Sequence, residues 1–246
     1  MKYEGKSHIG LVRTVNQDAF CLHPLQDGRL LVVVCDGMGG PAGGEVASAL
    51  AVESVLQEIS LGYSALADEE ELLRLVRSAI EDANRTIHEK SMIREDLTGM
   101  GTTIVLALVT EEAAYVASVG DSRAYLFSAE EGNPSLIQIT HDHSVVQELV
   151  DGGTLSSEMA RNHPKKNIIT RALGTQNTVN IDYFKVLLEA GDRLLLCTDG
   201  LTNMLDENEI LSILKEHPDV DAVEAFISAT LDAGANDNVT VAVVQR

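Results

Sequence analysis

LLVVVCDGMGGPAGGE, residues 30–45, joins an apolar run to a carboxylate and then to a cluster of glycines. The mostly β-branched residues from Leu30 to Val34 are typical of a buried strand. We expect this strand to end at Asp36, after which five glycines follow within eight positions. An Asp-Gly turn would explain the pattern by itself. A site for a hard divalent cation would also explain it, because such ions bind carboxylate and carbonyl oxygens.

Four further aspartates stand beside strand-like segments elsewhere in the chain. They are Asp18 in GLVRTVNQDAF, after a strand-like start, Asp121 in AYVASVGDSR, Asp199 in RLLLCTDG and Asp237 in GANDNVTVAVV. A packed β-sandwich can bring such strand ends together, and clustered carboxylates repel one another unless a cation lies among them. Because the set contains oxygen ligands and no cluster of histidines or cysteines, it predicts magnesium or manganese rather than zinc.

Strands and helices occur in separate groups along the rest of the chain. Helical spacing of apolar residues predicts helices over 46–59 and 72–87, the second opened by a capping box of Asp68 and Glu71. Strands are predicted at 103–109, 113–119, 123–127, 136–140, 181–188, 193–198 and 239–245, and helices at 206–216 and 219–233. Grouped strands argue against a βαβ parallel sheet. We therefore predict an α+β fold in one domain, 1–246, with a core of two antiparallel sheets and helices packed outside.

The composition restricts the classes of partner. The net charge of −20 argues against nucleic-acid binding, because such a surface repels phosphate backbones. No run approaches the roughly 18 apolar residues of a membrane span, and the first residues lack the apolar core of a signal peptide. Three widely separated cysteines, Cys21, Cys35 and Cys197, predict a reduced, intracellular protein with buried thiols.

Seven motifs carry a resemblance to a known family over nearly the whole chain. In order they are RTVNQD (13–18), CDGMGGPAGGE (35–45), GMGTT (99–103), VGDSRAY (119–125), THDHS (140–144), TDGL (198–201) and DNVTV (237–241). The series resembles the metal-dependent protein serine/threonine phosphatases of the protein phosphatase 2C type, in their compact bacterial form. The resemblance implies an α-β-β-α sandwich with the metal ions at one end.

The resemblance also implies a set of metal ligands, two manganese or magnesium ions in the catalytic centre, and a third in bacterial members. Asp36, Asp199 and Asp237 would hold the first ion. Asp36 would bridge to the second ion, which would also bind the backbone carbonyl of Gly37. Asp18 would support that second ion, largely through water.

Further residues complete the implied site. Asp121, together with Asp199, matches the third metal site, and Arg13 matches the arginine that binds the substrate phosphate, for which a planar cationic group is well suited. Met38 replaces a histidine that animal relatives carry as a proposed general acid, and Pro41 stands where many bacterial members have histidine. A metal-bound water is the proton source that this substitution leaves.

The implied reaction is the hydrolysis of phosphoserine and phosphothreonine monoesters on proteins by a bridging water activated by the metal ions. The resemblance further implies a cytoplasmic monomer with phosphoprotein substrates and no membrane partner, which would oppose a bacterial serine/threonine kinase. Two alternatives stay open at this point. One is a metal-binding sensor or regulatory module that lost turnover, and the other is an enzyme for a small phosphate ester or cyclic nucleotide.

The polar segment 142–170, which we call the flap, corresponds to the family's mobile flap beside the active site, and we expect substrate selection there. Two short patterns near it have competing interpretations. HDH at 141–143 could indicate an HD-type phosphohydrolase, but we expect it only to open the next helix. HPKKN at 163–167 could contact a phosphopeptide or a kinase, but we expect a solvated loop.

Overall fold

Two antiparallel β-sheets form the centre of the computed structural model, which describes residues 1–130 and 132–246 apart from the side chain of Pro41. The first sheet contains β1 (Lys2–His8), β7 (Arg123–Ser128), β8 (Ser135–Gln138), β10 (Arg193–Cys197) and β11 (Val239–Gln245), in the order β1-β11-β10-β7-β8. The second contains β2 (Asp18–Pro24), β3 (Leu30–Met38), β5 (Ile104–Val109), β6 (Ala113–Val119) and β9 (Asp182–Leu187), in the order β2-β3-β5-β6-β9, and the short β4 (Gly101–Thr102) pairs with β3. Pro41, which stands where many bacterial members of the resembled family have histidine, is therefore a position whose side chain is not described.

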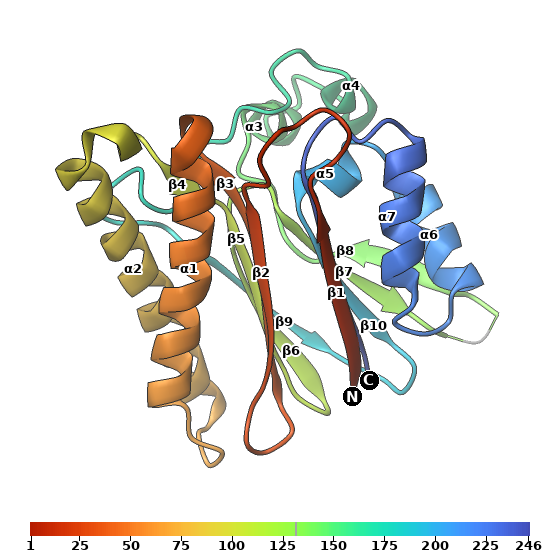
Figure 1. Cartoon of the computed structure of the whole chain (residues 1–246). Helices are drawn as coiled ribbons and strands as arrows, with labels where there is room; N and C mark the ends of the chain where they lie inside the picture. The colour runs from red at the N-terminus through yellow and green to blue at the C-terminus, as the bar shows by residue number, and fades with distance from the viewer. Residues whose placement is uncertain (131) are drawn as a thin grey trace.

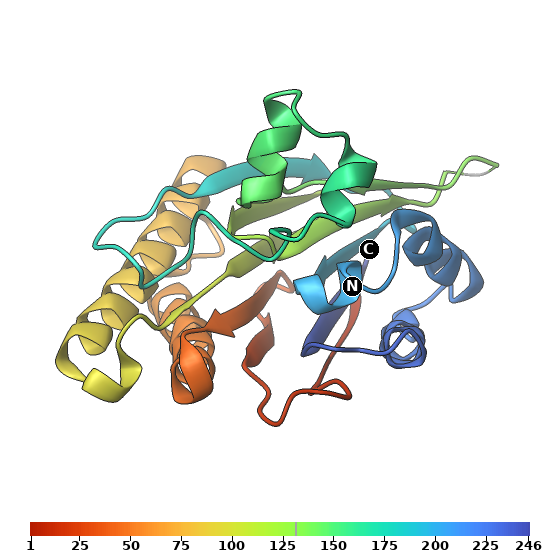
Figure 2. The same ribbon diagram turned by 90° about the horizontal axis from the view of Figure 1, so that it is seen from above.

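Helices cover the outer face of each sheet. The structure contains α1 (Gly40–Gly62), α2 (Glu69–Ile93), a 3₁₀ turn (Glu95–Leu97), α3 (Val145–Asp151), α4 (Ser157–Arg161), α5 (Asp199–Thr202), α6 (Glu207–Glu216) and α7 (Ala222–Asp232). The pair α1 and α2 packs on the second sheet, and the pair α6 and α7 packs on the first (Figure 1). Viewed from above, the layers follow one another as helices, sheet, sheet and helices (Figure 2). The predicted α-β-β-α sandwich is confirmed.

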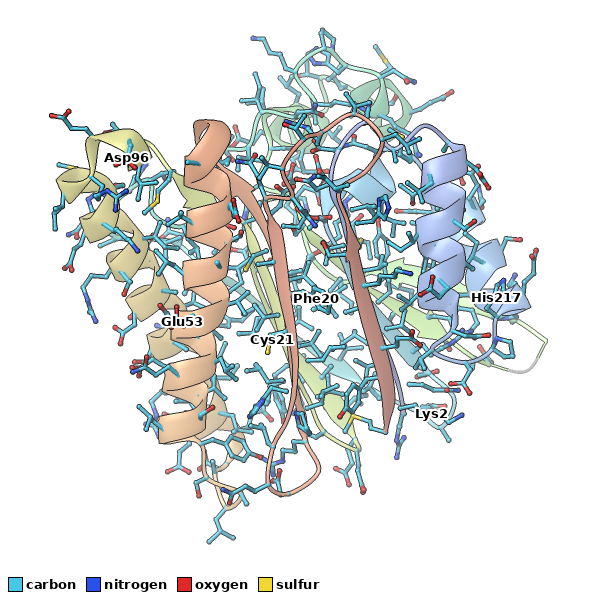
Figure 3. All side chains as sticks on the ribbon, viewed as in Figure 1. Lys2, Phe20, Cys21, Glu53, Asp96 and His217 are labelled. Carbon is cyan, nitrogen blue, oxygen red and sulfur yellow. The ribbon has the colours of Figure 1, made fainter. Side chains whose placement is uncertain are left out.

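Strand β3 shows why the decisive stretch is apolar without alternation. Three of its side chains, Leu31, Val33 and Cys35, pack towards α1 and α2. The alternate ones, Leu30, Val32 and Val34, pack against the other sheet. Both faces of the strand are therefore buried, and a strand covered on both faces needs apolar residues at every position. The neighbouring β2 divides in the same way, with Cys21 towards the helices and Phe20 between the sheets (Figure 3).

The junction after β3 differs from the sequence prediction. The strand continues to Met38, and α1 starts at Gly40, so the expected glycine turn consists of Gly39 alone, whose φ is +115°. The helix predicted over 46–59 is therefore too short at its start. Glycine is a poor helix former, but here close packing outweighs that preference, because a Cβ on Gly44 would lie 2.6 Å from a backbone oxygen of β3.

The sequence prediction is also wrong for the first two strands, β1 and β2. The residues before Asp18 form a loop, not a strand-like start, and Asp18 itself opens β2. Strand β1 has no counterpart in the prediction. It is an edge strand with partly exposed side chains and two lysines, Lys2 and Lys6, which is how natural edge strands avoid pairing with other chains.

Two predictions about the class of protein can be compared with the structure. In the described part of the chain, no helix combines the length and the apolar character that a membrane crossing requires. The three cysteines are free thiols, and Cys35 and Cys197 are buried while Cys21 is partly buried. The prediction of unpaired, largely buried thiols is thus confirmed.

Candidate active site

All five predicted aspartates lie at one end of the sandwich, the upper end in Figure 1, next to α3, α4 and α5. Asp36 lies near the end of β3, and Asp121 and Asp199 follow β6 and β10. Asp18 and Asp237 stand instead at the starts of β2 and β11. In an antiparallel sheet the start of one strand lies beside the end of its neighbour. For this reason Asp18 is directly opposite Asp36 in the register of β2 and β3.

A polar pocket of about 540 Å³ occupies this end. Six of the seven predicted site residues line it, namely Arg13, Asp36, Gly37, Asp121, Asp199 and Asp237. None of its described lining residues is aromatic. A second hollow of about 590 Å³ shares Asp121 and Asp199 with the first and extends below the flap. Because the two hollows share these two aspartates they are neighbours, and we call them together the acidic depression.

The carboxylates of this depression are buried together. Burial raises the pKa of Asp36, Asp121 and Asp199 above the usual range of aspartate, and neighbouring carboxylates add to each increase. Burial likewise raises the pKa of Asp18 to about 7. Within residues 1–130 and 132–246, no three carboxylate, imidazole or thiol groups converge into a finished metal-binding group. Four of the five aspartates line the pocket without forming such a group.

The residues present nevertheless suit a hard divalent cation. Asp18 Oδ1 and Asp199 Oδ1 are buried and have no hydrogen-bond partner. Buried polar oxygens without partners are costly. The described lining of the pocket contains carboxylates but no histidine or cysteine, and magnesium and manganese prefer such oxygen ligands. A cation in this space would partner the orphaned oxygen of Asp199 directly and that of Asp18 through water, and it would remove the repulsion among the carboxylates.

Hydroxyl and amide side chains orient two of these aspartates. Thr198 and Thr240 donate hydrogen bonds of 3.0 and 2.7 Å to Asp18 Oδ2. Asn203 Nδ2 donates a 2.8 Å bond to Asp199 Oδ2. In each carboxylate, hydrogen bonds fix Oδ2, and Oδ1 stays available to a cation or a water. Thr198 and Thr240 stand in the TDGL and DNVTV motifs, which by themselves predict no role for either threonine.

Gly37 lies where three backbone segments meet. Its N–H donates to Gln17 O at 3.1 Å, and a Cβ here would lie 2.0 Å from Gly44 O and 2.6 Å from Gln17 O. The family resemblance accounts for this glycine by the binding of its backbone carbonyl to an ion. The structure adds a packing reason, since only glycine lets β3, α1 and the preceding loop approach so closely.

Arg13 stands on the loop between β1 and β2 and is half exposed. Its Nη2 donates a 2.7 Å hydrogen bond to Asp237 Oδ2, which raises the pKa of Arg13. Asn238, whose role the sequence left open, binds three backbone groups of the loop 9–17 at 2.8 to 3.0 Å. Asn238 thus fixes the loop that carries the arginine.

Thr103, in the GMGTT motif, connects two of the aspartates. Its Oγ1 accepts a 2.9 Å hydrogen bond from the N–H of Asp36 and lies 2.7 Å from Ser122 Oγ. Ser122 directly follows Asp121. One buried hydroxyl therefore ties the end of β3 to the turn after β6, a function that the sequence motif gave no means to predict.

The HDH motif does not form a ligand cluster. His141 pairs with the exposed Asp151 at 2.8 Å, and Asp142 forms a bidentate ion pair with Arg123. His143 is buried and faces a different set of groups. The three side chains thus have separate partners, as expected for a motif that opens α3.

The position of the absent general acid is filled by Met38, which lines the pocket and packs beside Gly101. A thioether cannot donate a proton. No histidine of residues 1–130 or 132–246 lines either hollow. The flap contributes Lys166 and Asn167 from the HPKKN loop, Lys166 to the second hollow and Asn167 to the first.

Comparison with known proteins gives one consistent result. The family model described as Protein phosphatase 2C matches residues 4–239. The serine/threonine phosphatase stp of Listeria welshimeri is 40% identical over 247 residues, covering 100% of this chain and 96% of that protein. The crystal structure of the serine/threonine phosphatase Stp1 from Staphylococcus aureus has a TM-score of 0.91 at 34% identity, covering 100% of this chain and 94% of that one. A structure of the catalytic domain of the serine/threonine protein phosphatase PstP, in complex with two manganese ions, has a TM-score of 0.85 at 34% identity, covering 99% and 97%.

These similarities extend along the chain and include both sheets and the acidic end of the sandwich. The chain therefore belongs to the protein phosphatase 2C family, the metal-dependent protein serine/threonine phosphatases.

Proposed function

We propose that this chain, as a single catalytic domain over residues 1–246, removes phosphate from phosphoserine and phosphothreonine on proteins at the acidic depression, with manganese or magnesium as its cation. The observation that carries the proposal is the pocket in which Arg13 stands beside Asp36, Asp121, Asp199 and Asp237. A phosphate monoester is a dianion, so an acidic pocket can receive it only when cations reverse its charge.

The residues assigned to the cations are those that the family resemblance implies, and the pocket lining supports all of them except Asp18. Asp36, Asp199 and Asp237 would hold one ion, and Asp36 with the carbonyl of Gly37 a second. Asp18 lies opposite Asp36 in the register of β2 and β3 but does not line the pocket, and it would act through water. Asp121, with Asp199, faces both hollows and would serve a third ion. When bound, such ions bind phosphate oxygens and lower the pKa of water towards about 7, which makes a nucleophile available at neutral pH.

The protein's own groups would bind and orient the substrate. In the structure Arg13 is paired with Asp237. With Asp237 serving as a metal ligand, the guanidinium of Arg13 would be free to form two parallel hydrogen bonds to phosphoryl oxygens. The described lining of the pocket contains no aromatic residue on which a nucleobase could stack, so the pocket favours a phosphorylated side chain over a cyclic nucleotide.

Further parts of the proposal concern the setting of the enzyme. We propose a cytoplasmic monomer whose phosphoprotein substrates are supplied by a serine/threonine kinase, since phosphate esters must be formed before they are hydrolysed. The flap, 142–170, would select among them, because it borders both hollows through Lys166 and Asn167.

Phosphate release from a phosphothreonine peptide tests the function. Release is expected with added manganese and is expected to stop when a chelator is added. A protein that binds manganese and remains folded but releases no phosphate would leave the sensor alternative. Faster turnover of p-nitrophenyl phosphate or cyclic AMP than of any phosphopeptide would instead favour the small-ester alternative.

Replacing Arg13 tests the assigned phosphate contact. Arg13→Ala is expected to lower kcat/KM for the peptide about 30-fold, mainly through KM, since charge-assisted hydrogen bonds contribute about 1.5–3 kcal/mol. Arg13→Lys should recover part of the loss, because lysine keeps the charge but not the paired geometry. Steady-state kinetics at saturating manganese measures both. An unchanged KM in Arg13→Ala would contradict the assignment.

A further inference from the structure

His143 is a buried imidazole that no part of the proposed mechanism uses. Its side chain is 3% exposed and lies at the base of the flap. Nδ1 lies 3.0 Å from the N–H of Gly120, and Nε2 lies 3.1 Å from Asp182 Oδ2 and 3.1 Å from Arg171 Nη1. Every polar atom of the ring thus has a neighbour, and the neighbours come from three separate segments.

These contacts define the tautomer of the ring. The Gly120 N–H can only donate, so Nδ1 must be the unprotonated acceptor. Nε2 then carries the hydrogen and donates it to Asp182. Arg171 also has only donors, so its bond goes to Asp182 Oδ1, at 2.9 Å, rather than to the ring. The result is a neutral imidazole between the Gly120 amide and the carboxylate of Asp182.

Gly120 and His143 hold each other in both directions. The N–H of His143 donates to Gly120 O at 3.0 Å, and the N–H of Gly120 donates to the ring. Gly120 has a φ of +108°, and a Cβ on it would lie 2.6 Å from Thr103 Cγ2. The turn is therefore packed on one side and hydrogen-bonded on the other. The next residue is Asp121, which lines both hollows.

The same residue joins the two ends of the flap. Thr170 N–H donates to His143 O at 2.8 Å, and Val145 N–H donates to Ile168 O at 2.9 Å. Ser144 and Ile169 form a β-bridge between these bonds. Any displacement of His143 would therefore move the flap base and the Gly120–Asp121 turn together.

We propose that His143 is a positioning residue, whose Nδ1 fixes the Gly120–Asp121 turn so that the Asp121 carboxylate is held for its cation, and whose backbone ties both ends of the flap to that turn. The proposal rests on the proposed function in one respect, the use of Asp121 as a metal ligand. Groups that orient a ligand contribute strongly to metal affinity, with losses of roughly tenfold to a hundredfold when they are removed.

Two substitutions distinguish the contact made by Nδ1 from the contact made by Nε2. His143→Asn places an amide oxygen near the position of Nδ1, where it can accept from Gly120, but it is too short to reach Asp182. His143→Gln reaches the position of Nε2 and Asp182 but offers no acceptor to Gly120. His141→Asn makes the same change in an exposed histidine of the same segment and is the matched control. Circular dichroism establishes that each variant is folded.

The measurements include two that do not depend on turnover. Amide exchange of Gly120 is expected to be at least about tenfold faster in His143→Gln than in wild type, because the amide loses its partner. Manganese binding to metal-free protein, followed by calorimetry, is expected to show one class of sites weakened about tenfold in the same variant. His143→Asn and the control should stay close to wild type in both measurements.

Equal losses in His143→Asn and His143→Gln would overturn the proposal, since the ring would then act only by packing. Unchanged manganese affinity in His143→Gln would do the same. If that variant fails to fold, imidazole ¹⁵N shifts of the wild-type protein decide, and a ring protonated at Nδ1 contradicts the proposal. Absence of phosphate release from wild-type protein would defeat the proposed function, while amide exchange and manganese binding would still test His143.

Discussion

Replacing Asp36 by asparagine is expected to reduce kcat on a phosphothreonine peptide by at least about a thousandfold at fixed manganese. Asp36 lies near the end of β3, lines the pocket, and is surrounded by the charges of Asp18, Asp199 and Asp121. Asparagine keeps the shape but removes the charge and one oxygen ligand. The loss should appear in kcat, since the phosphate contact assigned to Arg13 remains.

The matched control is Asp96→Asn, which makes the same substitution at a residue that lines neither hollow. Asp96 pairs with Arg94 in the turn after α2, on the outer side of the helical layer (Figure 3). Its kinetics should equal those of wild type. Metal-free Asp36→Asn should also be at least as stable as metal-free wild type, because a buried charge that repels its neighbours is gone. A folded Asp36→Asn protein with more than about a tenth of the wild-type kcat would contradict the assigned role.

The metal-free protein is expected to lose stability as the pH rises from about 4 to about 7. Burial raises the pKa of Asp18 to about 7 in the folded state, against about 3.9 in an unfolded chain. Below the unfolded value both states are protonated and the stabilisation is fully present. Between the two values only the folded state binds the proton, so the free energy of unfolding falls by up to about 4 kcal/mol and then levels off.

Urea denaturation in chelator at several pH values measures this change, and Asp18→Asn isolates it. The asparagine variant lacks the titrating group, so its free energy of unfolding should fall less steeply over the same interval. Saturating manganese should reverse the trend in wild type, because a cation stabilises the ionised carboxylates, and excess ligand at 100 times Kd adds about 2.7 kcal/mol. Identical pH slopes for wild type and Asp18→Asn would show that Asp18 is ionised in the metal-free fold.

Much of the fold could be predicted from local pattern. Strands such as β6 and β11 and helix α6 lie close to their expected limits, and the capping box of Asp68 and Glu71 is present. Where prediction failed, a tertiary contact was responsible. α1 starts among glycines because it packs on β3, and β1 exists because β11 offers it a partner, in the register Lys2 to Gln245.

The candidate site divides in the same way. The sequence predicted which oxygens could bind a cation, because five aspartates recur beside apolar strands and a turn explains them only one at a time, and the ordered motifs determined the family. The supporting groups could not be predicted. Thr103, Asn238 and His143 act only through residues that are distant along the chain. Hydrogen bonds of this kind depend on distances and angles that exist only after the sheets have packed.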